Sequence, residues 1–248
     1  MSEDMTYDLG LVLEHGPEVY AGTGLDVRTV AAGIPGETKE HLRFDRVPWS
    51  RFFHAHGADD AVPRDLAELR SGGAADGEKA LDALWEKVCR EGMTYAPGAL
   101  AVPFLLRIAA APSAGDPAGV LHLTAEAARR ERFGDGTRSG LLRIGDEETV
   151  YDTFGYPVNW SVEAARDAIA ADARILLPLL DAPAPEVRTA SCYALAAASY
   201  GSERISSALL ERFGSEEAPE VRASLVLAVA QLARESGDTK RAAGMRAL

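Results

Sequence analysis

Two stretches of the chain open with the same four letters: PEVRTASCYALAAA, Pro185–Ala198, and PEVRASLVLAVAQL, Pro219–Leu232. They begin at positions 185 and 219, a spacing of 34 residues. In both, apolar residues recur every three or four positions, the pattern of a helix with one buried face. Proline suits the first turn of a helix, where a missing N–H costs nothing, and the glutamate after it suits the helix dipole. Each stretch therefore predicts a helix that begins at its proline.

A shorter apolar stretch precedes each of these helices: ARILLPLLD, Ala173–Asp181, and ISSALLERF, Ile205–Phe213. The repeated unit is thus helix, turn, helix. A single hairpin of this kind cannot bury its own apolar face, but stacked neighbours can cover one another. Three further helical patterns lie in the middle of the chain, at Gly77–Gly92, Pro97–Pro112 and Gly119–Gly134. We expect a mainly α fold in which helical hairpins stack into an α–α superhelix.

The residues that follow the two prolines resemble the HEAT repeat, in which a turn ending in Asp or Pro leads to Val-Arg and then to an Ala/Leu-rich helix. Val187, Arg188, Val221 and Arg222 occupy those positions. The resemblance implies a HEAT/armadillo-like solenoid. It also implies a structural role for the two arginines, which in such repeats tie neighbouring repeats together through carboxylates or helix C-termini.

Residues 48–133 and 160–248 further resemble a group of HEAT-repeat-containing proteins common in high-GC actinobacteria. The resemblance rests on the HAHGADDAVP stretch between Trp49 and Gly72, on the AVPFLL stretch between Ala80 and Ala109, and on Trp160 with the helices that follow it. His56 departs from the pattern, which leads us to expect tyrosine there. The group brings no activity with it and implies an interaction protein.

Two segments do not follow the repeat. Residues 1–47 are rich in Gly, Val and Tyr and predict an irregular or β-containing N-terminal arm that can form a hairpin. Residues 134–160 form a long insertion, in which LLRI and TVYDTF can pair as two short strands. The expected organisation is therefore an arm at 1–47, first helical repeats at 48–133, the insertion at 134–160, and HEAT-like repeats at 161–248.

Charge and composition restrict the possible partners. The chain of 248 residues has 26 basic and 38 acidic side chains, a formal net charge of −12, and residues 1–47 hold nine acids against four bases. Such a field repels a phosphate backbone, so we expect no nucleic-acid partner. No apolar run approaches the about 18 residues of a membrane span, and the acidic N-terminus is not typical of a secretory signal. Two distant cysteines in apolar helical patterns indicate buried thiols in a reducing compartment, and we expect a cytoplasmic protein.

The stretch FFHAHGADD, from Phe52 to Asp60, holds the best catalytic candidates of the chain: His54, His56, Asp59 and Asp60. Histidine and aspartate together can bind zinc or iron. However, two histidines spaced by one residue point in different directions on a helix, so we assign no metal and no cofactor. The structural alternative places His54 in a helix interface and leaves His56 exposed or capping. No Gly-x-Ser-x-Gly elbow is present, and neither cysteine has a histidine close in sequence.

These observations favour an interaction module or regulator that binds another protein on a concave helical surface. Aromatic side chains anchor interfaces best, so the expected binding residues are Trp49, Phe52, Tyr95, Tyr151, Phe154 and Trp160. The alternative is an enzyme that acts on a small molecule on the same scaffold; a deep pocket around His54 and His56 would favour it.

Two less favoured hypotheses concern basic proteins and DNA. A toxin-neutralising protein could cover a basic enzyme with the acidic surface of this chain. A DNA glycosylase-like protein would share the helical content, but the net charge of −12 disfavours it, because duplex DNA needs a positively charged groove. The oligomeric state stays open.

Overall fold

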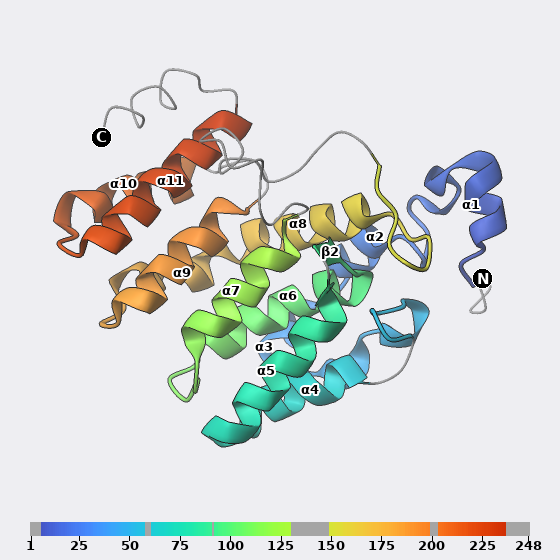
Figure 1. Cartoon of the computed structure of the whole chain (residues 1–248), viewed down its shortest axis with the longest axis horizontal. Helices are drawn as coiled ribbons and strands as arrows, with labels where there is room; N and C mark the ends of the chain where they lie inside the picture. The colour runs from blue at the N-terminus through green and yellow to red at the C-terminus, as the bar shows by residue number, and fades with distance from the viewer. Residues whose placement is uncertain (1–5, 58–60, 91, 130–148, 199–202, 237–248) are drawn as a thin grey trace.

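The computed structural model describes residues 6–57, 61–90, 92–129, 149–198 and 203–236, and most of these residues lie in helices (Figure 1). The mainly α fold class is therefore confirmed. The larger part of the molecule consists of α4 (Ala61–Ser71), α5 (Ala74–Val88), α6 (Ala96–Ala109), α7 (Pro117–Ala127), α8 (Val158–Leu176), α9 (Pro185–Ala196), α10 (Glu203–Ser215) and α11 (Pro219–Glu235). A minimal antiparallel pair, β1 (Cys89–Arg90) and β2 (Met93–Thr94), pairs Cys89 with Thr94 between α5 and α6.

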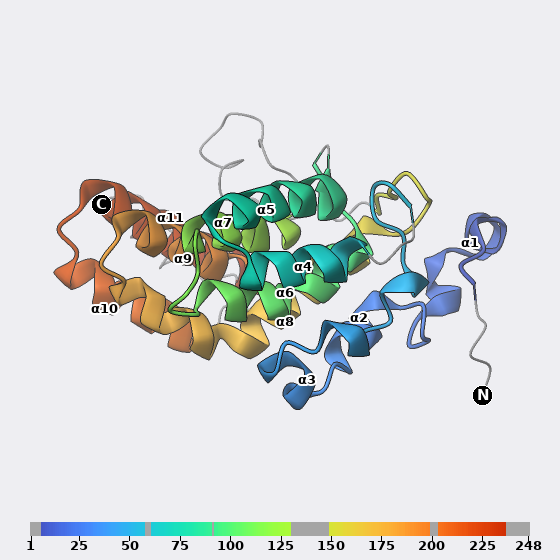
Figure 2. The same ribbon diagram turned by 90° about the horizontal axis from the view of Figure 1, so that it is seen from below.

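Successive helices alternate between two layers. Figure 2 shows α4, α6, α8 and α10 in one layer and α5, α7, α9 and α11 in the other. From α4 to α9 each helix packs against the next along the chain, and most also pack against the following helix of their own layer, as α7 does with α9 and α9 with α11. Helix α10 packs against α11 and against the 3₁₀ helix that follows α8. Both PEVR helices begin at the predicted prolines, Pro185 and Pro219. The helix expected at residues 173–181 is the end of α8, continued by the 3₁₀ helix η5 (Leu177–Asp181), because Pro178 fits the start of a new turn.

The central helix is α6. Every residue of α6 except Arg107 is buried, and the helix continues through Pro103. Such a helix is apolar all round and must be covered on all sides. Neighbours from both layers and from the N-terminal region do so: α2, α3, α4, α5, α7 and α8. The Arg107 guanidinium donates to the carboxylates of Asp172 at 2.8 Å and Glu40 at 2.7 Å, so the one charged group of α6 is paired at its edge.

The prediction of a β-hairpin in residues 1–47 is wrong for the described residues 6–47, which form short helical turns. These are α1 (Leu9–His15), η1 (Pro17–Tyr20), α2 (Val27–Ala32), α3 (Gly36–Glu40) and η2 (Phe44–Arg46). Aspartate caps start two of them: the Asp8 carboxylate accepts from the Gly10 N–H and the Asp26 carboxylate from the Arg28 N–H. Capping and burial of one side of each turn override the strand-like composition.

Only one of the two strands expected in the insertion, TVYDTF, lies in the described residues, where Tyr151 makes an isolated antiparallel bridge with Pro157. LLRI lies outside the described residues. Residues 149–157 form a turn in which the buried Asp152 carboxylate accepts from the N–H groups of Phe154 at 2.8 Å and Tyr156 at 2.9 Å. Burial raises the pKa of Asp152, and those two hydrogen bonds act against the rise. The α8 helix then begins at Val158, just after Pro157.

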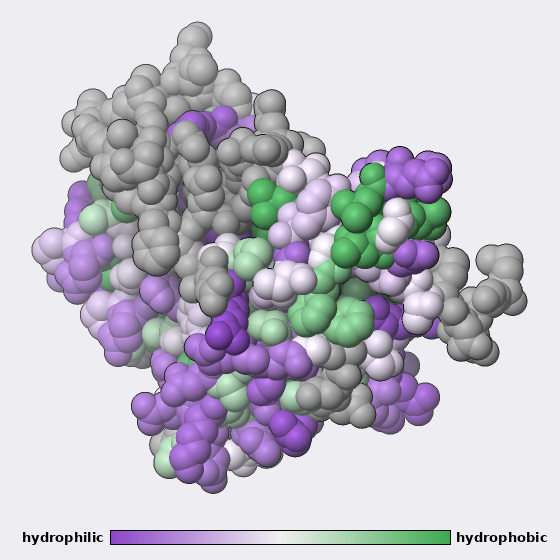
Figure 3. Space-filling model, turned by 45° about the vertical axis from the view of Figure 1, so that its right-hand side comes forward, coloured by the Kyte–Doolittle hydropathy of each residue, from purple (hydrophilic) through white to green (hydrophobic). Residues whose placement is uncertain are grey.

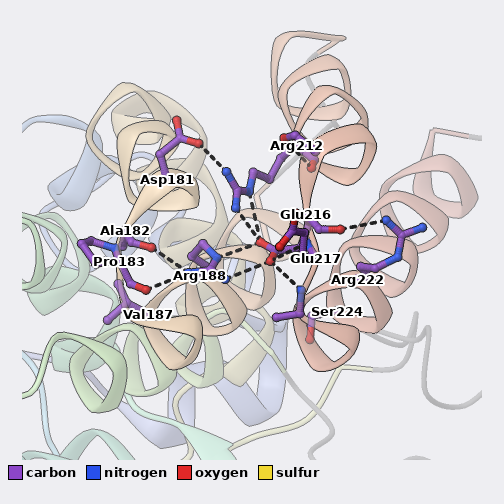
Figure 4. A network of polar contacts seen from close by, with 12 residues as sticks. Asp181, Ala182, Pro183, Val187, Arg188, Arg212, Glu216, Glu217, Arg222 and Ser224 are labelled. Atoms are coloured by element: carbon purple, nitrogen blue, oxygen red, sulfur yellow. Dashed lines mark hydrogen bonds and ion pairs between the residues drawn. The ribbon is translucent and has the colours of Figure 1, made fainter.

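The two arginines of the PEVR stretches make equivalent contacts, as Figure 4 shows. Arg188 donates to the Ala182 carbonyl at 2.9 Å and Arg222 to the Glu216 carbonyl at 3.0 Å, in each case six residues upstream. Arg188 also forms a two-pronged ion pair with the Glu216 carboxylate, at 2.7 and 2.9 Å. Glu216 follows α10, so Arg188 connects one helical hairpin to the next.

Glu216 is the centre of this network. Its carboxylate also accepts from Arg212 at 2.8 Å and from the Ala218 N–H at 2.9 Å, and Arg212 in turn pairs with Asp181. The Arg188 guanidinium, the Ala218 N–H and Arg212 hold the pKa of this buried carboxyl well below its usual range. The charged form is therefore strongly favoured in the folded protein.

The two cysteines are also in the interior, where the side chains of Cys89 and Cys192 are buried thiols. Burial raises the pKa of Cys192 to about 12. Among the helices of the described ranges, none combines the length and the apolar character needed to cross a membrane.

The network predicts a large cost for Arg188→Ala. Removing the guanidinium leaves the Glu216 carboxylate buried with a weaker set of partners, so the free energy of unfolding should fall by about 3 kcal/mol at pH 7. Urea denaturation followed by circular dichroism measures it. Arg204→Ala, an exposed arginine on α10, is the matched control and should change stability by less than about 0.5 kcal/mol. Equal effects of the two substitutions would contradict the structural role of Arg188.

The same network predicts a pH dependence. The pKa of Glu216 is depressed in the folded state, so its contribution is complete above the unfolded value of about 4.3 and is lost as the pH falls through the folded value. The stability difference between the wild-type chain and Glu216→Gln should therefore be largest at neutral pH and shrink steadily below about pH 4. Denaturant titrations at a series of pH values test this, and a difference that grows toward acid would contradict it.

Candidate protein-interaction surface

Four of the six aromatic residues expected to bind a partner lie in the core: Trp49, Phe52, Tyr95 and Trp160. Trp49 is 4% exposed and donates its indole N–H to the Phe44 carbonyl at 2.8 Å. Trp160 is also 4% exposed, and the Arg28 guanidinium lies 4.1 Å from its ring centroid. With so little accessible surface, these four side chains stabilise the fold and offer almost nothing to a partner.

The remaining two, Tyr151 and Phe154, reach the surface in the turn before α8. Tyr151 is 40% exposed, and Phe154 is partly exposed. Phe154 stacks on Phe53, with ring centroids 4.8 Å apart and an angle of 21° between the planes. The sequence did not single out Phe53, which is 42% exposed. The stacked pair thus brings together two segments that are about a hundred residues apart in the chain.

Helix α1 and the turn η1 after it add further exposed apolar side chains at this end of the molecule. Leu9, Leu11 and Val19 are exposed, and Leu13 is 79% exposed. Leu9 lies directly over Gly155, where a side chain would overlap it, and Gly155 has a φ of 77° that glycine adopts without strain. The α1 helix is therefore in contact with the turn that carries Phe154.

Polar and ring contacts fix α1 in this place. The Tyr7 hydroxyl donates to the Gly155 carbonyl, and the Tyr7 ring lies 5.2 Å from the rings of both Tyr20 and Tyr156. The buried Tyr156 hydroxyl accepts from the Val27 N–H at 2.9 Å and donates to the Leu25 carbonyl at 2.7 Å. These contacts of Tyr7 and Tyr156 hold the N-terminal turns against the loop before α8.

We call this area the N-terminal apolar surface; it consists of Leu9, Leu11, Leu13, Val19, Phe53, Tyr151 and Phe154. Figure 3 brings this end of the molecule forward and shows hydrophobic side chains gathered over it, with hydrophilic ones at the margin. In the part of the chain that the structure describes, eight large hydrophobic side chains are exposed, and six of them belong to this surface. Exposed apolar side chains gathered at one end of a protein mark candidate interaction sites.

The rings of the two candidate histidines are neighbours, with centroids 6.2 Å apart and an angle of 69° between their planes. His54 and Gly57 exchange backbone hydrogen bonds in a tight turn, and the buried His54 Nδ1 accepts from the His56 N–H at 3.1 Å. The His56 ring is exposed, and its Nδ1 lies 3.4 Å from Arg90. Asp59 and Asp60 lie outside the described residues. Within the described ranges, no group of three or more His, Cys, Asp and Glu side chains is arranged to hold a metal ion.

A second feature is a groove on the layer of α7, α9 and α11, with a volume of about 620 Å³. Its polar lining comes from Asp116, His122, Glu186, Thr189 and Glu220. The three carboxylates belong to the ends at which Pro117, Pro185 and Pro219 start parallel helices, and Asp116 caps α7 by accepting from the Gly119 N–H at 2.9 Å. An open groove with this lining can accommodate a cationic side chain. In the sequence, each of the three carboxylates stands next to a proline that starts a helix, and this repeated pairing is the signal from which the groove could have been predicted.

Comparisons of the chain with protein-family models, with curated proteins and with solved structures find no match.

Buried and exposed aromatic residues should differ in how much their removal lowers the stability of the fold. Trp49→Ala and Trp160→Ala each remove a buried indole and should lower the free energy of unfolding by about 3–5 kcal/mol. Phe53→Ala removes an exposed ring with one stacking partner and should cost about 1 kcal/mol or less. Urea denaturation at a fixed protein concentration compares the three variants. A loss at Phe53 as large as that at Trp49 would show that Phe53 is a packing residue and not part of a free surface.

Proposed function

We propose that the chain is a protein–protein interaction module built on HEAT-like stacked helical hairpins and that the N-terminal apolar surface is its principal contact site. The observation that carries this proposal is the concentration of exposed leucine and aromatic side chains at one end of the molecule. Exposing them costs free energy in water, and covering them with a partner recovers it.

The surface is suited to binding because it is held in shape before a partner arrives. Asp152, Gly155 and Tyr156 fix the loop that presents Phe154, and the Tyr7 hydroxyl ties the start of α1 to the same loop. Preformed side chains lose less conformational entropy on association, so more of the burial energy becomes affinity.

The helical part supports the HEAT-like half of the proposal. The alternation of helices between two layers and the equivalent contacts of Arg188 and Arg222 are what stacked repeats require. The groove on the layer of α7, α9 and α11 gives such a scaffold a second place where a partner side chain can dock.

The features that would favour a small-molecule enzyme are not assembled. The two rings lie 6.2 Å apart, but His54 is buried with its Nδ1 accepting from the His56 N–H, whereas the His56 ring is exposed beside Arg90. A general acid and base that act on one substrate would both need to reach it. A nucleic-acid function finds no support in a formal net charge of −12.

The test places a photo-crosslinking amino acid at position 53 of the full chain expressed in its native host. We expect a discrete crosslinked protein, and we expect Leu13→Asp in the same chain to reduce its yield by about tenfold or more, because the new carboxylate would be buried in the contact. Leu13 is largely exposed, so this variant should fold normally, as thermal denaturation can verify.

Leu227→Asp is the matched control, because Leu227 is 49% exposed on α11, away from the N-terminal apolar surface. It should leave the crosslink intact. If Leu13→Asp and Leu227→Asp behave alike, or if no protein is crosslinked from position 53, the N-terminal apolar surface is not the contact site.

A further inference from the structure

The charges beside the N-terminal apolar surface restrict the chemistry of its partner. Asp8, Glu14 and Glu18 are exposed in the same short segment that presents Leu9 and Leu13. Within the described part of the chain, no lysine or arginine forms an ion pair with any of these three carboxylates. The His15 ring lies beside Glu14, with its Nε2 3.7 Å from the carboxylate.

The bases of the N-terminal region are largely committed elsewhere. Residues 1–47 contain nine acidic and four basic side chains. Arg28 pairs with Asp26 at 2.9 Å, and Arg43 and Arg46 both lie against Asp45, at 3.2 and 3.4 Å. The carboxylates around α1 therefore present a net negative rim with which no lysine or arginine of the described residues forms an ion pair.

We propose that the N-terminal apolar surface binds a segment of a partner protein in which apolar side chains are flanked by lysine or arginine. This inference rests on the proposed function and specifies the partner for the same surface. The leucine and aromatic side chains cover the apolar residues of the segment, while the carboxylates at the rim attract the flanking cations. Interfaces are commonly built with such an apolar centre and a charged rim, and complementary charge selects the partner and speeds the encounter.

A second copy of this chain fits the surface less well. A two-fold interface would bring the surface onto itself, with the carboxylates of Asp8, Glu14 and Glu18 facing their own copies. Like charges brought together in this way oppose association. An anionic lipid surface is disfavoured for the same reason, since its headgroups would meet the same carboxylates.

The test uses three labelled synthetic peptides of equal length and the purified full chain. The first peptide carries leucines at helical spacing flanked by lysines, the second replaces every lysine with glutamate, and the third keeps the lysines and replaces every leucine with serine. Fluorescence anisotropy at low and moderate salt measures each affinity. We expect the lysine–leucine peptide to bind about tenfold or more tightly than either of the remaining two, with an affinity that falls as salt is added.

Variants of the chain place the binding on the surface. Leu13→Ser should weaken binding of the lysine–leucine peptide without altering charge, and the double variant Glu14→Gln/Glu18→Gln should weaken it by about fivefold and reduce its salt dependence. Leu227→Ser is the control for the first variant and should bind as the wild-type chain does.

Three sets of results would overturn the inference. Equal binding of the lysine and glutamate peptides, tighter binding of the glutamate peptide, or no binding of any peptide means that the carboxylate rim does not select a basic partner. Self-association that Leu13→Ser abolishes, measured by light scattering, means that the occupant is a second copy. Unchanged binding in Leu13→Ser means that the peptide binds elsewhere. A crosslinked partner at position 53 combined with any of these results leaves the proposed function standing and removes only the partner chemistry.

Discussion

The burial of α6 is the constraint on which the rest of the structure depends. Thirteen of its fourteen residues are buried, so no side of the helix can face water. Each large apolar side chain that is fully buried contributes about 1.5–3 kcal/mol, and those of α6 can be covered only if helices pack around the whole circumference. The short turns α2 and α3 could not persist alone, and they close the part of that circumference that α4, α5, α7 and α8 leave open. The segment from α2 to α3 is therefore needed to cover α6, and Val12, Tyr20 and Leu25 before it belong to the same hydrophobic core.

The sequence predicts the helices whose signals are local. Pro185 and Pro219 mark helix starts because the residue types of a first turn and the apolar period agree there. The strand expected near the N-terminus has a different origin: it rests on a composition rich in Gly, Val and Tyr and not on a local start signal. In the structure Leu9–His15 is one short helix that buries Val12 and leaves its three leucines outside. The Asp8 cap and the packing of Tyr7 decide between the two, and only the packing lies beyond local sequence.

The candidate surface was predictable only in part, for a similar reason. Trp49 and Trp160 are conspicuous in the sequence, but large aromatic rings gain the most from burial and are therefore commonly found in the core. Tyr151 and Phe154 lie in a loop that Asp152 folds back on itself, and this loop presents them to solvent. Phe52 and Phe53 are adjacent in an extended segment, where neighbouring side chains point in opposite directions, and the sequence alone does not say which of the two faces inward.

The burial of both cysteines has a practical consequence. The thiolate is the form that reacts with maleimides, iodoacetamides and disulfide reagents, and Cys192, with its pKa raised to about 12, supplies almost none of it at neutral pH. Cys89 is enclosed as well. The chain has no other cysteine, so thiol reagents should label the unmodified protein very little. In Leu13→Cys, a single reactive sulfur would stand in the N-terminal apolar surface, where a fluorophore or spin label could report occupancy directly while the interior thiols stay unmodified.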